Sequence, residues 1–132
     1  MNQYDDYLPS EAYDSDMPPQ YDLYVEERQL RSKLDALIDE YRRCGTEHAK
    51  RDREYYALKA AKTLELKEQG MPATVITQII KGVEPVAVAR EKMLVSETMA
   101  RAALEAILST KLQIKLVESQ LQREYSNPQA GY

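Results

Sequence analysis

Apolar residues recur at steps of three and four along the chain from Tyr24 onward, which is the spacing of one face of an α-helix. The members of the first stripe are Leu30, Leu34, Leu37, Ile38 and Tyr41, followed after a polar centre by Tyr55, Leu58, Ala61 and Leu64. Gly70 is the residue type favoured just past a helix end, and Pro72 prevents the helix from continuing. The pattern therefore predicts a first long helix over residues 24–69.

A short segment with a different pattern follows, "ATVITQIIKG" at residues 73–82. It predicts a helix of about two turns that ends at Gly82. We expect its apolar residues to pack onto the ends of both long helices, and these residues are Val75, Ile76, Ile79 and Ile80. Met71 and Val83 flank this tip and are expected to leave a small surface for a partner.

A second long helix is predicted over residues 85–126. Pro85 suits the first helical position, and nothing breaks the helical pattern again before Pro128. Two long helices joined by a short connection favour an antiparallel hairpin, so the predicted fold class is all-α. We take residues 23–126 as one hairpin domain and expect residues 127–132 to be a flexible C-terminus.

The hairpin also predicts which residues face one another. If the chain folds back at roughly residue 77, the numbers of facing residues sum to about 155. The large side chains of Tyr55 and Tyr56 then lie level with a group of small residues, as close packing favours. These small residues are Ala100, Ala102 and Ala103, and the other expected pairs are Leu30 with Tyr125, Leu34 with Leu121, Ile38 with Val117 and Tyr41 with Ile114.

In this register a polar centre on the first helix faces apolar residues on the second. The polar stretch is "RRCGTEHAKRDRE", residues 42–54. A two-helix hairpin cannot cover the apolar residues of the second helix, because they occupy more than one side of it. We therefore expect self-association into a four-helix bundle or a larger helical assembly. The residues expected to take part are Leu104, Ile107, Leu108, Leu112 and Leu116.

Charge separates the first 22 residues from the rest of the chain. Residues 1–22 contain no Lys or Arg, and their acids are Asp5, Asp6, Glu11, Asp14, Asp16 and Asp22. Because the whole chain has a formal net charge of -4, the remaining residues are close to neutral. We expect this acidic, tyrosine-rich tail to be disordered when free. It is either a solubilising tail or a recognition segment that folds on a partner.

The polar centre of the first helix is also the candidate ligand site. Its basic residues and its histidine are Arg42, Arg43, His48, Lys50, Arg51 and Arg53. Paired across an oligomer, such a cluster suits an anion such as a nucleotide or a phosphate backbone. Acidic residues are interleaved with it, so the alternative is a solvated surface of helical charge pairs.

Side chains suited to catalysis or metal binding are scarce. Cys44 and His48 lie four residues apart, but the chain has one cysteine and one histidine, so we predict neither an internal disulfide nor a metal site. Ser96 and Ser109 have no histidine within reach along a helix, which leaves nucleophilic catalysis without support. No glycine-rich phosphate loop is present. We therefore predict no enzymatic activity and no cofactor.

The sequence also bears on location. No apolar run approaches the roughly 20 residues that cross a bilayer. The first residues, "MNQYDDYLPSEAYDSD", lack the basic and apolar parts of a signal peptide. We expect a cytoplasmic protein without a membrane partner.

Two stretches resemble a group of small uncharacterised phage and prophage proteins that form helical hairpins. The stretches are "LKAAKTLELKEQGMPATVITQIIKG" and "VAVAREKMLVSETMARAALEAILSTKLQIKLVESQLQREYS". The shared features are a "GMP(A/V)T" turn, an "AALEAI" helix and a "KLQI" segment before a terminal aromatic residue. This chain ends the match with Arg123, Glu124 and Tyr125, where those proteins have a Glu-Arg-Glu-Trp-like sequence. The resemblance implies a phage origin and a bacterial host cell, and it implies no activity.

The stretch "LKEQGMPATVITQIIKG" also resembles the first half of a helix-turn-helix module. The recognition helix would then lie in "VEPVAVAREKML". Positions that read bases in such modules hold Val86, Ala87, Val88 and Ala89 here. Only Arg90 and Lys92 suit contacts to phosphate groups or guanine edges, so DNA reading is a weaker alternative.

Together these features predict a non-enzymatic, phage-type interaction protein. It would bind and modulate a macromolecule of the host or the phage, such as a component of host defence, and act as an inhibitor. The first alternative is an oligomeric sponge that sequesters a small anionic ligand such as a nucleotide signal. The second alternative is the helix-turn-helix-like DNA binder.

Overall fold

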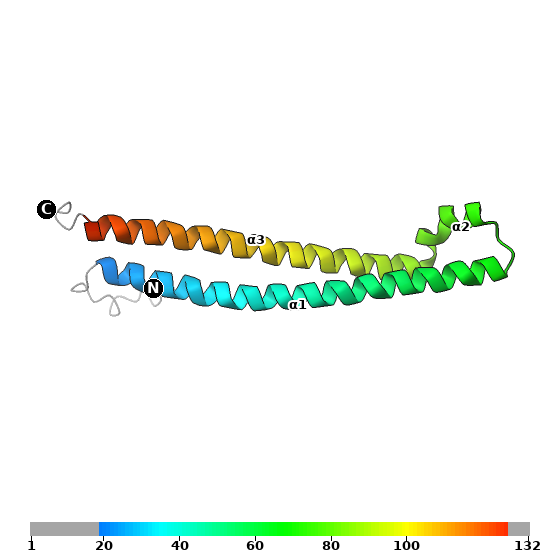
Figure 1. Cartoon of the computed structure of the whole chain (residues 1–132), viewed down its shortest axis with the longest axis horizontal. Helices are drawn as coiled ribbons and strands as arrows, with labels where there is room; N and C mark the ends of the chain where they lie inside the picture. The colour runs from blue at the N-terminus through cyan, green and yellow to red at the C-terminus, as the bar shows by residue number, and fades with distance from the viewer. Residues whose placement is uncertain (1–18, 127–132) are drawn as a thin grey trace, which may run out of the picture.

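A computed structural model of the chain describes residues 19–126. Helix α1 spans Pro19–Glu68, α2 spans Ala73–Ile79, the 3-10 helix η2 spans Ile80–Gly82 and α3 spans Glu84–Ser126. Figure 1 shows α1 and α3 side by side and antiparallel, with α2 at the closed end. No strand occurs in this part of the chain. The predicted all-α helical hairpin is therefore confirmed.

The first helix begins earlier than predicted. Pro19 opens α1, since proline suits the first helical position, so the last part of the predicted tail 1–22 is helical. The reason lies at the open end of the hairpin, where Leu23 is buried against Val117 and Leu121 of α3. The disorder predicted for residues 1–18 and 127–132 falls outside the described residues.

One row of side chains on each long helix forms the contact between α1 and α3, and we call these two rows the seam. On α3 every seam position is buried or half-buried; the positions are Val86, Ala89, Met93, Ser96, Ala100, Ala103, Ile107, Thr110, Ile114, Val117, Leu121 and Glu124. On α1 they are Leu23, Glu27, Leu30, Leu34, Leu37, Tyr41, Cys44, His48, Arg51, Tyr55, Leu58 and Lys62, of which only Tyr41 is exposed. Both rows alternate steps of three and four, which is the pattern of a coiled coil.

The register of the seam differs from the predicted one. His48 lies opposite Ser96, and Arg31 reaches Glu118 across the hairpin. The predicted sum placed each α1 residue about two to three helical turns further along α3. Tyr55 is consequently buried with Val86 near the tip, rather than level with the alanines around Ala103.

The tip explains this displacement. Helix α1 extends past the start of α3, and α2 and η2 fold back alongside its last turns (Figure 1). Ile76 and Ile80 fill the resulting corner, where they are buried with Tyr55 and Val86. Because α2 and η2 lie alongside the last turns of α1, α3 begins level with a residue that precedes the end of α1. This offset between the two long helices sets the register of the seam.

The tip also orients its apolar residues differently from the prediction. Ile76 and Ile80 point inward, but Val75 and Ile79 are exposed. Even together, α2 and η2 are so short that they offer the core one pair of side chains four residues apart, and the neighbouring pair turns away. The two residues expected to face a partner, Met71 and Val83, instead pack against the buried tip cluster.

Gly70 ends α1 as predicted. It is the single residue with positive φ among those described, at 85°. The amide of Gly70 donates to the carbonyl of Lys67, and the amide of Met71 donates to the carbonyl of Leu66. These two bonds form a Schellman motif, which satisfies carbonyls at the helix end.

We expect Gly70→Ala to lower the free energy of unfolding by about 1 kcal/mol, because a Cβ atom is disfavoured at this positive φ. A methyl group there has open space, so the effect reports backbone strain alone. Gly45→Ala is the matched control, because Gly45 lies within α1 and also has open space. The control should raise stability by about 0.5–1 kcal/mol. Equal effects in urea denaturation would contradict the assigned turn.

Candidate functional site

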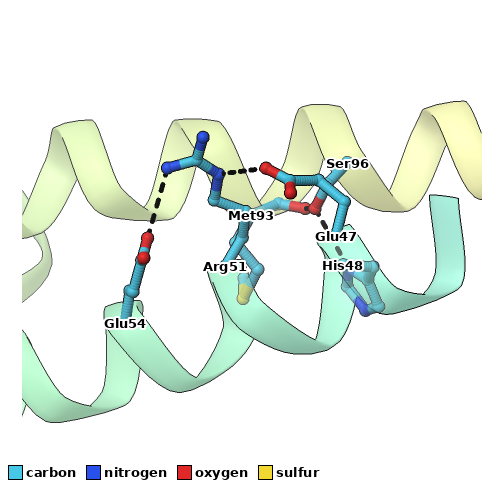
Figure 2. A network of polar contacts seen from close by, with 6 residues as sticks. All are labelled: Glu47, His48, Arg51, Glu54, Met93 and Ser96. Carbon is cyan, nitrogen blue, oxygen red and sulfur yellow. Dashed lines mark hydrogen bonds and ion pairs between the residues drawn. The ribbon is translucent and has the colours of Figure 1, made fainter. Parts of the chain in front are cut away.

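A polar layer interrupts the apolar seam near its middle. His48 Nδ1 lies 3.1 Å from Ser96 Oγ, and Ser96 Oγ lies 2.7 Å from the carbonyl oxygen of Met93 (Figure 2). A serine hydroxyl has one hydrogen, which the Met93 carbonyl accepts. His48 Nδ1 therefore carries a proton and donates it to Ser96, which fixes the ring across the hairpin.

This contact corrects one sequence-based expectation. The sequence places no histidine within reach of Ser96 along its own helix, but the hairpin brings His48 of the other long helix across to it. The arrangement is suited to positioning rather than nucleophilic attack, since the Ser96 hydroxyl donates to a backbone carbonyl. Ser96 is also buried within the seam.

Arg51 occupies a seam position but bonds along its own helix. Its Nε donates to Glu47 Oε1 at 2.7 Å and its Nη1 donates to Glu54 Oε2 at 3.2 Å (Figure 2). The hydrogen bond that Arg51 donates to Glu47, and then the charge of Glu47, raise the pKa of the Arg51 guanidinium above its ordinary value. The positive charge of Arg51 is thus compensated within α1.

Cys44 lies one helical turn from His48, towards the open end of the hairpin. Its thiol donates to Glu40 Oε1 at 3.6 Å, and Glu40 also accepts from Arg43. The hydrogen bond from Arg43 and its charge lower the pKa of the Glu40 carboxyl. Burial first, and then the Glu40 charge, raise the pKa of the Cys44 thiol. The thiol is therefore protonated at neutral pH and less reactive than an ordinary cysteine thiol.

A groove of about 660 Å³ runs along one side of this polar centre, between α1 and α3. Its α1 wall is charged and includes Glu40, Arg43, Glu47 and Arg51, with Cys44 at its base. Its α3 wall includes the apolar residues Val88, Val95 and Met99. The groove is open to solvent, and its α3 wall also holds Glu91 and Lys92, so both walls offer ion pairing and the α3 wall adds apolar contact.

The six residues of the predicted cationic cluster do not lie together at one site. Arg43 and Arg51 line the groove, but Arg42 pairs with Asp39 at 3.5 Å on the surface. Lys50 and Arg53 are exposed and do not line the groove, and His48 belongs to the seam. Three of the six predicted residues, Arg42, Arg43 and Arg51, are thus paired with acids on their own helix. This is the arrangement expected of a solvated surface of helical charge pairs.

The residues predicted for self-association also separate into two groups. Ile107 is 6% exposed and belongs to the seam, so it needs no cover from a second chain, contrary to the expectation. The register explains the correction, because Ile107 faces apolar α1 residues rather than the polar centre. The others are exposed on α3, with Leu104 at 38%, Leu108 at 51%, Leu112 at 60% and Leu116 at 62%.

The α3 wall of the groove was missed by sequence reasoning. Val88, Val95 and Met99 were not proposed as site residues, although they recur at the steps of seven and four that mark one helix side. The sequence contains a second apolar row on α3, separate from the row that packs on α1. This second row can be identified once the residues of the seam are known.

Comparisons with protein-family models, with curated proteins and with solved structures gave no match to this chain. None of the helices between residues 19 and 126 has the length and apolar character needed to cross a membrane. Over the same residues, no group of three or more His, Cys, Asp or Glu side chains is placed to hold a metal ion.

We expect Cys44 to react with iodoacetamide more slowly at pH 8 than a cysteine in an unstructured peptide, because its raised pKa keeps the thiol protonated. Glu40→Gln should lower the pKa of the thiol by removing a nearby negative charge, and the reaction should then begin at lower pH. Burial remains, so the pKa should stay above its ordinary value. Glu47→Gln is the control, because Glu47 bonds Arg51 and not Cys44. Identical pH profiles for the two variants would contradict this account.

Ser96→Ala should destabilise the hairpin by about 1 kcal/mol relative to Ser119→Ala, an exposed serine on the same helix. The loss arises because the half-buried His48 Nδ1–H is left without its acceptor. Adding His48→Leu to Ser96→Ala should recover the stability, since both polar partners are then gone. Urea denaturation at fixed protein concentration measures all three changes in stability. Equal stabilities for the two single variants would show that the polar layer contributes nothing to the free energy of unfolding.

Proposed function

We propose that the chain is a non-enzymatic interaction protein that self-associates and binds a macromolecule of a phage or its host. The observation that supports this proposal is the outward side of α3. Four leucines recur there at steps of four, and each is more than one-third exposed: Leu104, Leu108, Leu112 and Leu116. Contiguous exposed apolar surface of this kind marks an interaction site.

The two long helices differ in their solvent-facing sides. The exposed surface of α1 is rich in charged residues, many of them paired within the helix. The exposed surface of α3 carries these four leucines, which we call the leucine row. Burying one leucine side chain contributes about 1.5–3 kcal/mol, so a partner that covers several of them gains a substantial binding energy. The hairpin is thus an elongated rod that presents one apolar row on α3.

The biological setting of the proposal rests on the resemblance to phage proteins. A small phage-type protein without an evident catalytic constellation suits the role of a binder that inhibits or redirects a component of the bacterial cytoplasm, including host defence. The apolar row on α3 is the surface that we assign to that partner.

A sponge for a small anionic ligand is the second candidate function. The groove supports it, because its volume lies in the range of ligand pockets and Arg43, Arg51 and Lys92 line it. The intrahelical pairing of Arg43 and Arg51 weakens it. DNA reading has less support, since Val86, one of the residues at the base-reading positions, is fully buried in the tip.

We expect the double variant Leu108→Glu and Leu112→Glu to lose a stoichiometric protein partner that the wild type retains from a lysate of its bacterial host. Carboxylates on the leucine row would have to be buried unpaired in the complex. Arg101→Glu is the control on the same side of α3, because it also adds negative charge but removes no leucine. Equal recovery by all three proteins, or no specific partner at all, would contradict the proposal.

A thermal-shift screen of nucleotides tests the sponge. A ligand at about 100 times its dissociation constant should stabilise the protein by about 2.7 kcal/mol. The interaction protein predicts no shift with any nucleotide. A shift that Arg43→Ala and Arg51→Ala abolish would favour the sponge instead.

A further inference from the structure

The leucine row lies beside basic side chains on α3. Its last three leucines are each more than half exposed. Residues 106–117 of the helix contain no acid, and their two charged residues, Lys111 and Lys115, are both basic and both exposed. Neither lysine forms an ion pair within residues 19–126. This stretch therefore combines exposed apolar surface with positive charge that the hairpin leaves uncompensated.

The acids of α3 that are nearest in sequence lie at the two ends of this stretch. Glu118 follows it and is paired with Arg31 across the hairpin at 2.6 Å. Glu105 precedes it, next to Leu104 at the start of the leucine row. The positive charge is therefore centred on the second half of the row, around Leu112.

The segment before α1 has a complementary composition. Residues 1–18 contain no Lys or Arg, and their five acids are Asp5, Asp6, Glu11, Asp14 and Asp16. The large apolar and aromatic side chains among them include Tyr4, Tyr7, Leu8 and Tyr13. Carboxylates pair with ammonium groups, and tyrosine rings bury a large apolar area while their hydroxyl groups stay in water. The segment therefore fits the leucine row in both charge and apolar character.

The segment also starts within reach of the row. Leu23 packs with Leu121 at the open end of the hairpin, so Pro19, where α1 begins, lies level with the last turn of α3. Leu104, the leucine farthest from that level, is roughly 30 Å away along α3. An extended chain spans at most about 3.3–3.6 Å per residue, so residues 1–18 span up to roughly 60 Å. The difference is enough to pass from α1 to the outer side of α3, a helix about 10–12 Å wide.

We propose that residues 1–18 dock on the leucine row of their own chain, rather than remain a free tail. Traced back from the start of α1, the segment runs from the open end towards the tip, so its direction is that of α3. At about 3.3 Å per residue, Glu11 and Asp14 come level with the two lysines, and Tyr13 comes level with the leucines beside them. Docking thus neutralises the lysines and covers the leucines together.

Docking regulates the leucine row, and this part of the inference rests on the proposed function. A partner that binds the row has to displace the segment. The tether holds the segment at an effective concentration on the order of mM, so the partner's apparent affinity is reduced by the fraction of chains whose row is covered. The segment is therefore autoinhibitory, and it shields apolar surface in the free chain.

The distance between two spin labels tests the docking in the full chain. In a Cys44→Ser background, Ser10→Cys and Ser109→Cys carry nitroxides at positions that supply no acid, tyrosine or leucine. The docked segment predicts a narrow distribution of distances below about 25 Å. An unrestrained segment predicts a broad distribution centred beyond roughly 30 Å, and this result would overturn the proposal.

Charge reversal identifies the surface on which the segment docks. Lys111→Glu with Lys115→Glu should turn the narrow distribution into the broad one, because the acids of the segment would then meet like charges. Lys50→Glu with Arg53→Glu is the matched control, since it reverses two exposed charges on α1, away from the row. Circular dichroism checks that both variants remain helical. The same distribution in both variants would overturn the leucine row as the docking site.

A second exchange tests the pairing of charges. Glu11→Lys with Asp14→Lys, added to the double lysine variant, restores opposite charges between the segment and α3. The narrow distribution should return. A distribution that stays broad would overturn the assigned contacts of Glu11 and Asp14.

Mixed samples show whose segment covers the row. Chains labelled only at position 10 are mixed with chains labelled only at position 109. Docking within one chain predicts no short distance between the two kinds of chain. A short distance in the mixture would mean that the segment of a second copy occupies the row, and it would overturn docking within the chain.

These measurements need no partner, so the inference and the proposed function fail separately. A narrow, short distance together with no captured macromolecule would contradict the proposed function and leave the docking in place. Capture of a partner through the leucine row, by a chain whose labels give the broad distribution, would overturn the docking alone.

Discussion

The contact between α1 and α3 through one repeating row of side chains determines the rest of this structure. The rows repeat every seven residues, so two helices of 50 and 43 residues stay in contact from Leu23 to Lys62 of α1. Apolar clusters hold the two ends, around Tyr55 at the tip and Leu23 at the open end. The polar layer of His48 and Ser96 lies between them. The seam therefore sets which residues remain outside, and these residues carry the proposed interactions.

Much of the fold could be predicted because its signals are local. Gly70 and Pro72 end α1 by backbone chemistry alone, and the periodicity of apolar residues gives both long helices. The register could not be predicted in the same way. It depends on how Ile76 and Ile80 fold back against α1, and a sequence does not show whether a short connecting helix lies beyond the long helices or alongside one of them.

The error in register carried over to the site. It placed Ile107 opposite the polar centre, where we expected it to need cover from a second chain, whereas the structure buries it in the seam. It also concealed the contact between His48 and Ser96, which are far apart in sequence. The charge pairs on α1 were foreseeable from spacings of three and four, since both partners lie on the same helix. The groove was not, because its two walls come from different helices.

The most direct test of this account is the register of the hairpin itself. In a Cys44→Ser chain, cysteines at positions 31 and 118 replace the ion pair that joins Arg31 to Glu118 at 2.6 Å. A short bifunctional thiol reagent should cross-link this pair within one chain, as seen by the mass of the denatured product. It should not cross-link positions 31 and 124, which the predicted register would have placed level. Efficient cross-linking of 31 to 124, with none between 31 and 118, would contradict the seam and everything derived from it.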